Sequence, residues 1–288
     1  MDERYIDRYW TSPDGLQLHY RDYAASEGSE ALPVICLHGL TRNARDFAKL
    51  AEHIAPARRV IVPEMRGRGL SDYAKDSSTY ALPTYVADMQ ALLADQGIEK
   101  FVAIGTSMGG LITMLTSLVR PGVIAGAVIN DIGPEVDPTG IERIAGYVGQ
   151  GRSYPTWMHA ARALQEAHSA SAPDFTIHHW LAMAKRAMVL SQNGRISYDY
   201  DMAIAEPFRE AGNTPAADLW PAFESLGGVP LLLVRGEISD LLSVKTAQEM
   251  GERHPDLTLV TIPRTGHAPS LEEPASMEAI DALLARVP

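Results

Sequence analysis

The 288-residue sequence has a single cysteine, no long apolar run and no cluster of basic residues. Cys36 can form neither an internal disulfide nor a thiolate metal cluster, and its place in the run PVICLHG favours a buried, small apolar side chain. No stretch approaches the ~20 apolar residues that a bilayer-spanning helix needs. The opening MDERYIDRYW lacks the apolar centre of a signal peptide. We therefore expect a soluble, cytoplasmic protein that does not engage a membrane.

The scarcity of positive charge excludes another class of partner. The formal net charge is −11 at pH 7, whereas proteins that bind nucleic acid displace counterions with many Lys and Arg side chains. The sequence also contains no G-x-G-x-x-G, no G-K-[ST], no H-E-x-x-H and no C-x-x-C, and His178 and His179 are adjacent rather than one helical turn apart. We expect no nucleic acid partner, no cofactor and no metal.

Short apolar runs alternate with amphipathic stretches, which is typical of an α/β fold with a mostly parallel, doubly wound sheet. RYIDRYWTS and LQLHYRDY flank the turn PDG and predict an opening antiparallel hairpin. Continuous Val/Ile/Leu runs, which are typical of strands covered on both faces, then predict six further strands. These runs are PVICLHG, RRVIVPEM, KFVAIGT, IAGAVIND, VPLLLVRG and LTLVTIP. Helical spacing is found at 44–55, 82–97, 108–120, 244–254 and 274–287.

This alternation stops between the predicted strands IAGAVIND and VPLLLVRG, the sixth and seventh when the two hairpin strands are counted. The intervening span has no convincing strand but contains helical pieces rich in Met, Trp, His and Ala. We expect a core formed by residues 1–134 and 216–288, and a helical cap formed by residues 135–215. Because ligands of open α/β sheets bind at the carboxyl ends of the strands, an insertion that leaves such an end would cover the site. The alternative is a helical subdomain that only enlarges the core.

A candidate nucleophile follows the strand KFVAIGT. Residues 105–109, GTSMG, fit G-x-S-x-G between a predicted strand and a predicted helix. The small neighbours of Ser107 permit a sharp turn in which the backbones approach closely and the hydroxyl is exposed. The alternative is a Gly/Ser turn without chemistry.

A serine hydroxyl needs a base, and the base needs an orienting group. His267 lies in IPRTGHAPSLEEP, just after the last strand, and is the best-placed histidine in the sequence. For the acid we prefer Asp240, which lies in the loop after the penultimate strand and precedes two leucines that can shield it from water. Glu237 in the same loop and Asp131 in VINDIGP are held in reserve. Each of these is otherwise a loop carboxylate bonded to backbone amides.

Attack on a carbonyl creates an oxyanion that needs pre-positioned donors. The backbone N–H of Met108, at the head of the predicted helix, supplies one. The N–H of Leu40, in the loop after VICLHG, is the natural second donor.

Several of these motifs together resemble the α/β-hydrolase fold superfamily, in its esterase, lactonase and haloperoxidase-like branch. The motifs are His38-Gly39, RGRGLSD (66–72), GTSMGG (105–110), RGEISD (235–240) and GHAPSLEEP (266–274). The order Ser, Asp, His is also that of the superfamily. The resemblance covers about residues 10–134 and 216–288. It implies Ser107 as nucleophile, Asp240 as acid, His267 as base and the amides of Leu40 and Met108 as the oxyanion hole.

The sequence departs from the family pattern at two places. HGLTRN replaces a further glycine after His-Gly, so Thr41 and Arg42 narrow the loop or add donors. The spacing from glycine to aspartate in GEISD is one residue longer than the common G-x-x-D form, which keeps Glu237 in consideration. In RGRGLSD, relatives use the arginine and aspartate to hydrogen-bond neighbouring backbone, and we interpret Arg66 and Arg68 in the same way.

These patterns predict a serine hydrolase that cleaves a small carboxylic ester or lactone through an acyl-enzyme. One alternative is a carbon–carbon bond hydrolase of a vinylogous diketone, for which Arg143, Arg152 and Arg162 are candidates to bind a substrate acid. Others are a cofactor-free perhydrolase and a non-catalytic ligand receptor. Cap residues either contact the substrate or only hold the cap together. The candidates for substrate contact are Trp157, Trp180, Met183, Tyr147, Arg143 and His159. The sequence does not determine the oligomeric state.

Overall fold

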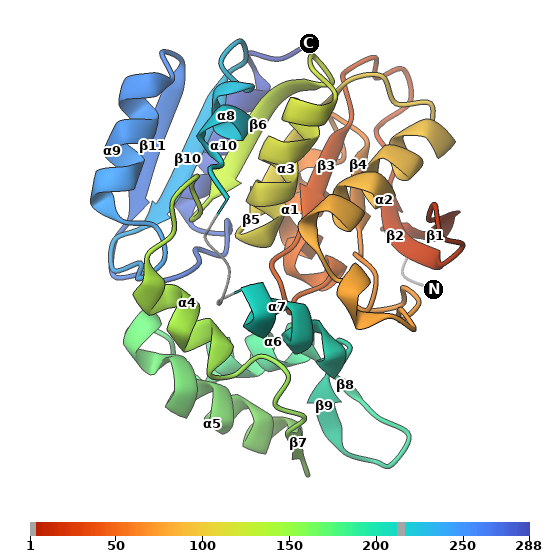
Figure 1. The fold of residues 1–288 in the computed structure, drawn as a ribbon, viewed down its shortest axis with the longest axis vertical. Helices are drawn as coiled ribbons and strands as arrows, with labels where there is room; N and C mark the ends of the chain where they lie inside the picture. Colours follow the sequence, from red (N-terminus) through yellow and green to blue (C-terminus); the bar gives the residue numbers. More distant parts are fainter. Residues whose placement is uncertain (1–3, 212–216) are drawn as a thin grey trace.

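A computed structural model of the protein describes residues 4–211 and 217–288. Its centre is an eight-stranded sheet in the order β1-β2-β4-β3-β5-β6-β10-β11 (Figure 1). The strands are β1 (Ile6–Thr11), β2 (Gln17–Tyr23), β3 (Val34–Leu37), β4 (Val60–Pro63), β5 (Phe101–Thr106), β6 (Ile124–Asn130), β10 (Leu231–Gly236) and β11 (Leu257–Ile262). β1 pairs antiparallel with β2, and β2 with β4, while all other neighbours in this sheet are parallel. The predicted opening hairpin and the six further strands are confirmed.

Helices cover both faces of this sheet (Figure 1). α1 (Ala48–Ile54) and α10 (Pro274–Leu284) bury their apolar residues on one face. The opposite face is covered by α2 (Leu82–Asp95), α3 (Met108–Val119), α8 (Trp220–Glu224) and α9 (Val244–Arg253). Two short 3₁₀ turns, η1 (Ala44–Phe47) and η2 (Ser77–Thr79), complete this part of the chain. Every residue of β3, β4 and β10 is buried, as expected of strands covered on both sides.

The chain between β6 and α8 forms a separate group of elements at one end of the sheet (Figure 1). Its helices are α4 (Pro138–Ala145), α5 (Trp157–His168), η3 (Ser169–Ser171), α6 (Ile177–Ala187), η4 (Met202–Ile204) and α7 (Ala205–Ala211). The apolar cluster inside this group includes Trp180, Leu164 and Met188. We refer to residues 138–211 as the cap. The predicted cap boundary at residue 215 lies outside the described residues.

The cap also contains a small sheet that the sequence did not predict. β7 (Ser153–Tyr154), β8 (Met188–Leu190) and β9 (Ile196–Tyr198) pair antiparallel in the order β7-β9-β8. The expectation that this span has no strand was therefore wrong. Strands of two or three residues are too short to leave an alternating pattern, and pairing within the folded cap stabilises them.

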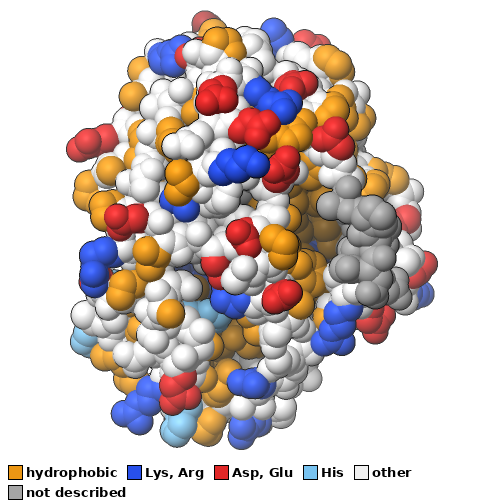
Figure 2. Space-filling view, turned by 60° about the vertical axis from the view of Figure 1, so that its left-hand side comes forward, with side chains coloured by type: hydrophobic (Ala, Val, Ile, Leu, Met, Phe, Trp, Pro, Cys, Tyr) orange, Lys and Arg blue, Asp and Glu red, His pale blue; other side chains and the backbone are white. Residues whose placement is uncertain are grey.

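Charges of both signs are mixed over the molecular surface. In Figure 2, Lys and Arg side chains lie among Asp and Glu side chains, and no extended basic patch is seen on that face. Within the described residues, no helix is both long and apolar enough to cross a membrane.

Candidate active site

Ser107 lies in the sharp turn between β5 and α3, with a strained backbone conformation of φ 53° and ψ −117°. The glycines around it explain how the turn fits. A Cβ added to Gly105 would lie 2.4 Å from the carbonyl oxygen of Gly109, and one added to Gly109 would lie 2.0 Å from that of Leu37. Both positions therefore exclude any larger residue, and the close backbone approach predicted from the sequence is confirmed.

His267, in the loop after β11, lies against the serine. Its Nε2 is 2.9 Å from Ser107 Oγ, and its Nδ1 is 2.8 Å from Oδ2 of Asp131. The imidazole is 9 % exposed and the carboxylate is fully buried. Three loops that are distant in sequence thus place hydroxyl, imidazole and carboxylate in one hydrogen-bonded series.

The carboxylate of this series corrects the sequence-based choice. Asp131 follows β6 in a left-handed conformation (φ 56°). Its Oδ1 accepts a hydrogen bond of 2.8 Å from the amide of Gly236, and its Oδ2 accepts one of 2.6 Å from the hydroxyl of Ser239. Ser239 stands where the common G-x-x-D form would place the acid. The serine there supports an acid that comes from the neighbouring strand, β6, instead.

Asp240 and Glu237 have other partners. Asp240 is paired with Arg143 of α4, with 2.8 Å between Oδ1 and Nη2 and a second contact from Nε to Oδ2. This pairing, more than any other cause, lowers the pKa of Asp240. Glu237 accepts the backbone N–H of Arg264 at 2.7 Å in an exposed loop. The preference for Asp240 as the orienting acid was therefore wrong, and Asp131, held in reserve, lies against the imidazole.

The loop after β3 carries Leu40, one of the two candidate oxyanion donors. Arg68 donates from Nε to the carbonyl of Leu40 at 2.9 Å and from Nη1 to that of Arg66 at 2.7 Å. Arg66 itself binds Asp14 and Asp88. RGRGLSD is thus a structural loop, and the expected backbone contacts are made by Arg68, whereas Arg66 binds carboxylates instead. Within the described residues, the amides of Leu40 and Met108 donate no hydrogen bond to the protein. For Met108 this is expected, because it is the first residue of α3.

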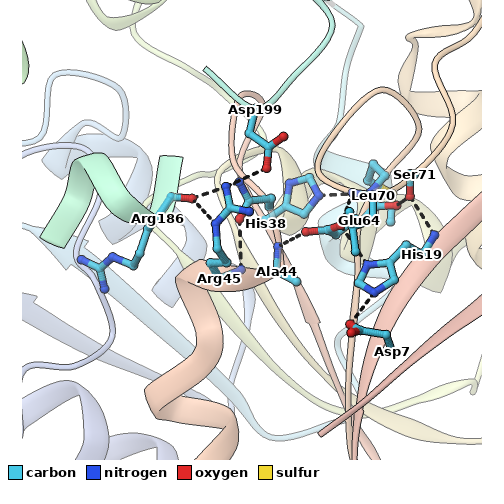
Figure 3. Close-up of polar contacts among 12 residues, drawn as sticks. Asp7, His19, His38, Ala44, Arg45, Glu64, Leu70, Ser71, Arg186 and Asp199 are labelled. Atoms are coloured by element: carbon cyan, nitrogen blue, oxygen red, sulfur yellow. Dashed lines mark hydrogen bonds and ion pairs between the residues drawn. The ribbon is translucent and has the colours of Figure 1, made fainter. Parts of the chain in front are cut away.

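A buried polar network stabilises the loop after β3 (Figure 3). Glu64, which follows β4, accepts hydrogen bonds from the amides of Ala44 and Leu70, at 3.0 and 2.7 Å, and contacts Nδ1 of His19 at 2.8 Å. His38 accepts the amide of Met65 at Nε2, at 3.1 Å. Burial, with a contribution from Arg68, lowers the pKa of His38 to about 4, so the imidazole is neutral and retains its acceptor nitrogen.

The same loop also holds the cap (Figure 3). Arg45 donates from Nε to the carbonyl of Arg186, at the end of α6, at 2.8 Å, and from Nη2 to Asp199 at 2.7 Å. Asn43 donates to the same carbonyl at 3.0 Å. Nη2 of Arg45 also donates to the carbonyl of Met188 at 3.5 Å, so the segment that carries Leu40 is joined to the cap by four hydrogen bonds.

A cavity of about 200 Å³ lies between the cap and the strand ends. It is lined by Ser107 and His267 and by the loop at Leu40, so it gives access to the hydrogen-bonded series. Of the cap residues predicted to contact a substrate, four line this cavity: Arg143, Tyr147, Trp180 and Met183.

The two other predicted cap contacts lie elsewhere. His159 is exposed at the start of α5, where its Nδ1 is 2.9 Å from the hydroxyl of Thr156. Trp157 packs against the cap's own apolar cluster. Both expectations were wrong because the start of α5 faces the cap interior and solvent. Sequence reasoning did not propose His168 or Arg186, which do line the cavity, because each has the spacing of an ordinary helical surface residue.

The described residues contain no group of three or more His, Cys, Asp and Glu side chains arranged to hold a metal ion. Among the titratable groups that line the cavity, Arg42, Arg143 and Arg186 are each paired with a carboxylate, and His267 belongs to the series with Ser107 and Asp131. The arrangement suits removal of a proton from the hydroxyl of Ser107.

Comparisons with known proteins agree with this geometry. A family model described as alpha/beta hydrolase fold matches residues 33–274. A protein of Cupriavidus necator named 3-hydroxybutyrate-oligomer hydrolase is 36% identical over 92% of each chain. A mouse protein named sn-1-specific diacylglycerol lipase ABHD11 is 26% identical over 91% of this chain and 84% of its own. The crystal structure of an alpha/beta hydrolase from Novosphingobium aromaticivorans is 58% identical, with a TM-score of 0.94 over 99% of each chain.

Proposed function

Because this chain belongs to the alpha/beta hydrolase fold family, we propose that it is a serine hydrolase that cleaves carboxylic esters or lactones through an acyl-enzyme. The observation that carries the proposal is the hydrogen-bonded series of Ser107, His267 and Asp131, whose two contacts to the imidazole are 2.9 and 2.8 Å. This series opens to a cavity and combines a nucleophile, a base and a buried orienting carboxylate.

In the first half of the reaction, His267 accepts the Ser107 proton at Nε2 while Oγ attacks the ester carbonyl. The resulting imidazolium is stabilised by Asp131, which also holds the proton at Nδ1 and so keeps Nε2 free to act as base. Collapse of the tetrahedral intermediate breaks the bond to the alcohol, which leaves with the proton from Nε2. The acyl group remains on Ser107.

In the second half, Nε2 accepts a proton from water, and the hydroxide attacks the acyl-enzyme carbonyl. The proton then returns to Oγ as the acid leaves. In both tetrahedral intermediates the negative oxygen accepts hydrogen bonds from the amides of Leu40 and Met108. Within the described residues, neither amide has another protein acceptor, so both are available for this role.

The names of two relatives support esters as the substrates. A hydroxybutyrate oligomer and a diacylglycerol both contain ester bonds, and the proteins named for acting on them match nearly the whole of this chain. Carbon–carbon bond hydrolysis and perhydrolysis use the same three groups, so substrate panels separate them from ester hydrolysis.

The test uses Ser107→Ala, with Ser78→Ala as the matched control at an exposed serine of η2. We expect Ser107→Ala to lose hydrolysis of short aryl esters and lactones and to lose covalent labelling by an organophosphonate, whereas Ser78→Ala keeps both. A dienoate ketone and hydrogen peroxide serve as alternative substrate and alternative acyl acceptor. Undiminished labelling of Ser107→Ala at another residue would refute the assignment.

A further inference from the structure

Three arginines reach one cavity beside Ser107. Arg42 lies in the loop after β3, Arg143 on α4 and Arg186 at the end of α6, and all three line the same space of about 200 Å³. Each of these guanidinium groups is already paired with a carboxylate that offsets its charge, and each keeps further N–H donors, because a guanidinium has five.

Two of these guanidinium groups are held in fixed orientations. Asp46 binds Nε and Nη2 of Arg42, each at 2.6 Å, and Asp240 binds the same two nitrogens of Arg143. In each pair the carboxylate occupies one edge of the planar fork and leaves Nη1 to other acceptors. A pre-oriented guanidinium loses little conformational entropy when it binds a further anion.

The third guanidinium has an unused donor. Arg186 donates from Nη1 to Glu272, while its Nε is buried without a hydrogen-bond partner among the described residues. A buried N–H that has lost water and gained no acceptor is unfavourable. An acceptor brought by a ligand would satisfy it.

The electrostatic field inside the cavity also favours a bound anion. His168 lines the cavity next to Tyr147, with 5.4 Å between the ring centroids. Burial, together with the charges of Arg143 and Arg42, lowers the pKa of His168 to about 4, so both guanidiniums oppose positive charge at this ring. The same field favours a negative charge at this position.

The position of Arg42 fixes how far such a charge lies from the reaction. A Cβ placed on Gly39 would lie 3.5 Å from Cγ of Arg42 and 3.8 Å from Cβ of Ser107, so the arginine stem and the serine flank the same glycine. The stem of Arg42 is therefore close to the nucleophile, and both residues line the same cavity. A short ester with an acid group would contact both.

We propose that the cavity binds a free carboxylate of the substrate through Arg42 and Arg143, with Arg186 as a third donor, so that the preferred substrates are short esters that carry an acid group. This inference rests on the proposed function. It adds to that function the class of substrate and the three arginines that bind its acid group. Bidentate guanidinium–carboxylate contacts supply both the orientation and the charge-assisted hydrogen bonds.

The first experiment compares esters that differ only in charge. One pair is 3-acetoxybutanoate and 3-acetoxybutanamide, with the charge on the alcohol side, and the other is monomethyl glutarate and its amide, with the charge on the acyl side. We expect one carboxylate ester to exceed its amide by roughly tenfold to a hundredfold in kcat/KM, mainly through KM. Equal turnover of acid and amide in both pairs would overturn the inference while leaving the serine hydrolase intact.

The second experiment removes the arginines. Arg42→Gln and Arg143→Gln are compared with Arg162→Gln, which changes an exposed arginine of α5 that does not line the cavity. We expect the preference for the acid to fall at least tenfold in the first two variants and to be unchanged in the third. If a glutamine variant does not fold, the lysine variant at that position keeps the charge but not the fork, and should lose part of the preference. A preference that survives at both sites refutes the assignment.

The third experiment separates this inference from the proposed function. In Ser107→Ala, calorimetry measures binding of 3-hydroxybutanoate, 3-hydroxybutanamide, monomethyl glutarate and the amide of monomethyl glutarate, and needs no turnover. Tighter binding of an acid than of its amide, lost in the Arg42→Gln background, supports the carboxylate site even if no ester is hydrolysed. Binding of neither acid, together with hydrolysis of neutral esters, would reject the site and retain the hydrolase.

Discussion

Replacing Asp131 or Asp240 by asparagine tests which of the two carboxylates orients His267. In Asp131→Asn, one amide oxygen replaces two carboxylate oxygens that accept from Gly236, Ser239 and His267. If the amide oxygen stays with Gly236, the NH₂ group faces His267 and forces the tautomer whose Nε2–H points at Ser107, which leaves no base. If the side chain flips, NH₂ opposes the buried amide of Gly236. The first arrangement disables the imidazole, and the second keeps the working tautomer only at the cost of two opposed, buried N–H groups.

The expected magnitude follows from these two arrangements. A wrong tautomer in a triad of this kind lowers kcat by about 10⁴-fold, which corresponds to about 5 kcal/mol of lost transition-state stabilisation. Asp240→Asn removes only the partner of Arg143 at a position that is 29 % exposed. Such a pair contributes at most about 1 kcal/mol to stability. We therefore expect kcat of Asp240→Asn to stay within about threefold of the parent protein.

The assay measures release of 4-nitrophenol from 4-nitrophenyl acetate. This neutral substrate isolates the chemical step from binding of an acid group by Arg143. Organophosphonate labelling counts competent sites in each variant, and circular dichroism confirms that both variants fold. If Asp240→Asn lost a thousandfold while Asp131→Asn stayed active, the assignment of Asp131 would be refuted.

Three further predictions concern stability and the cap. Gly109→Ala is expected to destabilise the protein by at least about 3 kcal/mol because its methyl group would meet the carbonyl of Leu37 at 2.0 Å. Gly251→Ala, where nothing lies within 4 Å, should instead stabilise α9 by roughly 0.5–1 kcal/mol; urea unfolding measures both, and equal effects would contradict the packing argument. The folded pKa of His38, about 4, is below its ordinary value of 6.5, so its stabilising contribution is complete above pH 6.5 and is lost as the pH falls toward 4. His38→Gln, which keeps an acceptor, should reduce this loss by roughly 3 kcal/mol, and an unchanged pH profile would show that another group is responsible. Arg45→Met removes three hydrogen bonds to the cap and should accelerate amide hydrogen exchange over residues 186–199, whereas unaltered exchange would mean that the cap is held by other contacts.

Much of the fold could be predicted because its signals are local. The runs that became β3, β4, β5, β6 and β10 could be recognised because strands covered on both faces must be apolar throughout. β11 was predicted in the same way, but it is an edge strand whose residues are mostly exposed or partly exposed. The strands of the cap were not, because β7, β8 and β9 have two or three residues each and form only when the cap brings them together. Ser107 and the glycines beside it were equally local, since a sharp strand-to-helix turn needs small residues at fixed spacing.

The partners of Ser107 could be predicted only in part from local sequence patterns. His267 could be chosen because it follows the last strand, and the carboxyl ends of parallel strands meet at one edge of the sheet. Asp131, Glu237 and Asp240 all satisfy that rule, so the sequence by itself determined a set of acids and not a choice among them. One signal was present: Ser239 stands where the usual spacing would place the acid, and this substitution pointed away from that loop.

The sequence by itself determined the order of strands and helices, the turn at Ser107 and the histidine that serves it, because these depend on neighbours in the chain. Only the tertiary structure decided which carboxylate lies against that histidine and which arginines share its cavity. A hydrogen bond requires atoms within about 3 Å, and His267 is 136 residues from Asp131 and 160 residues from Ser107 along the chain.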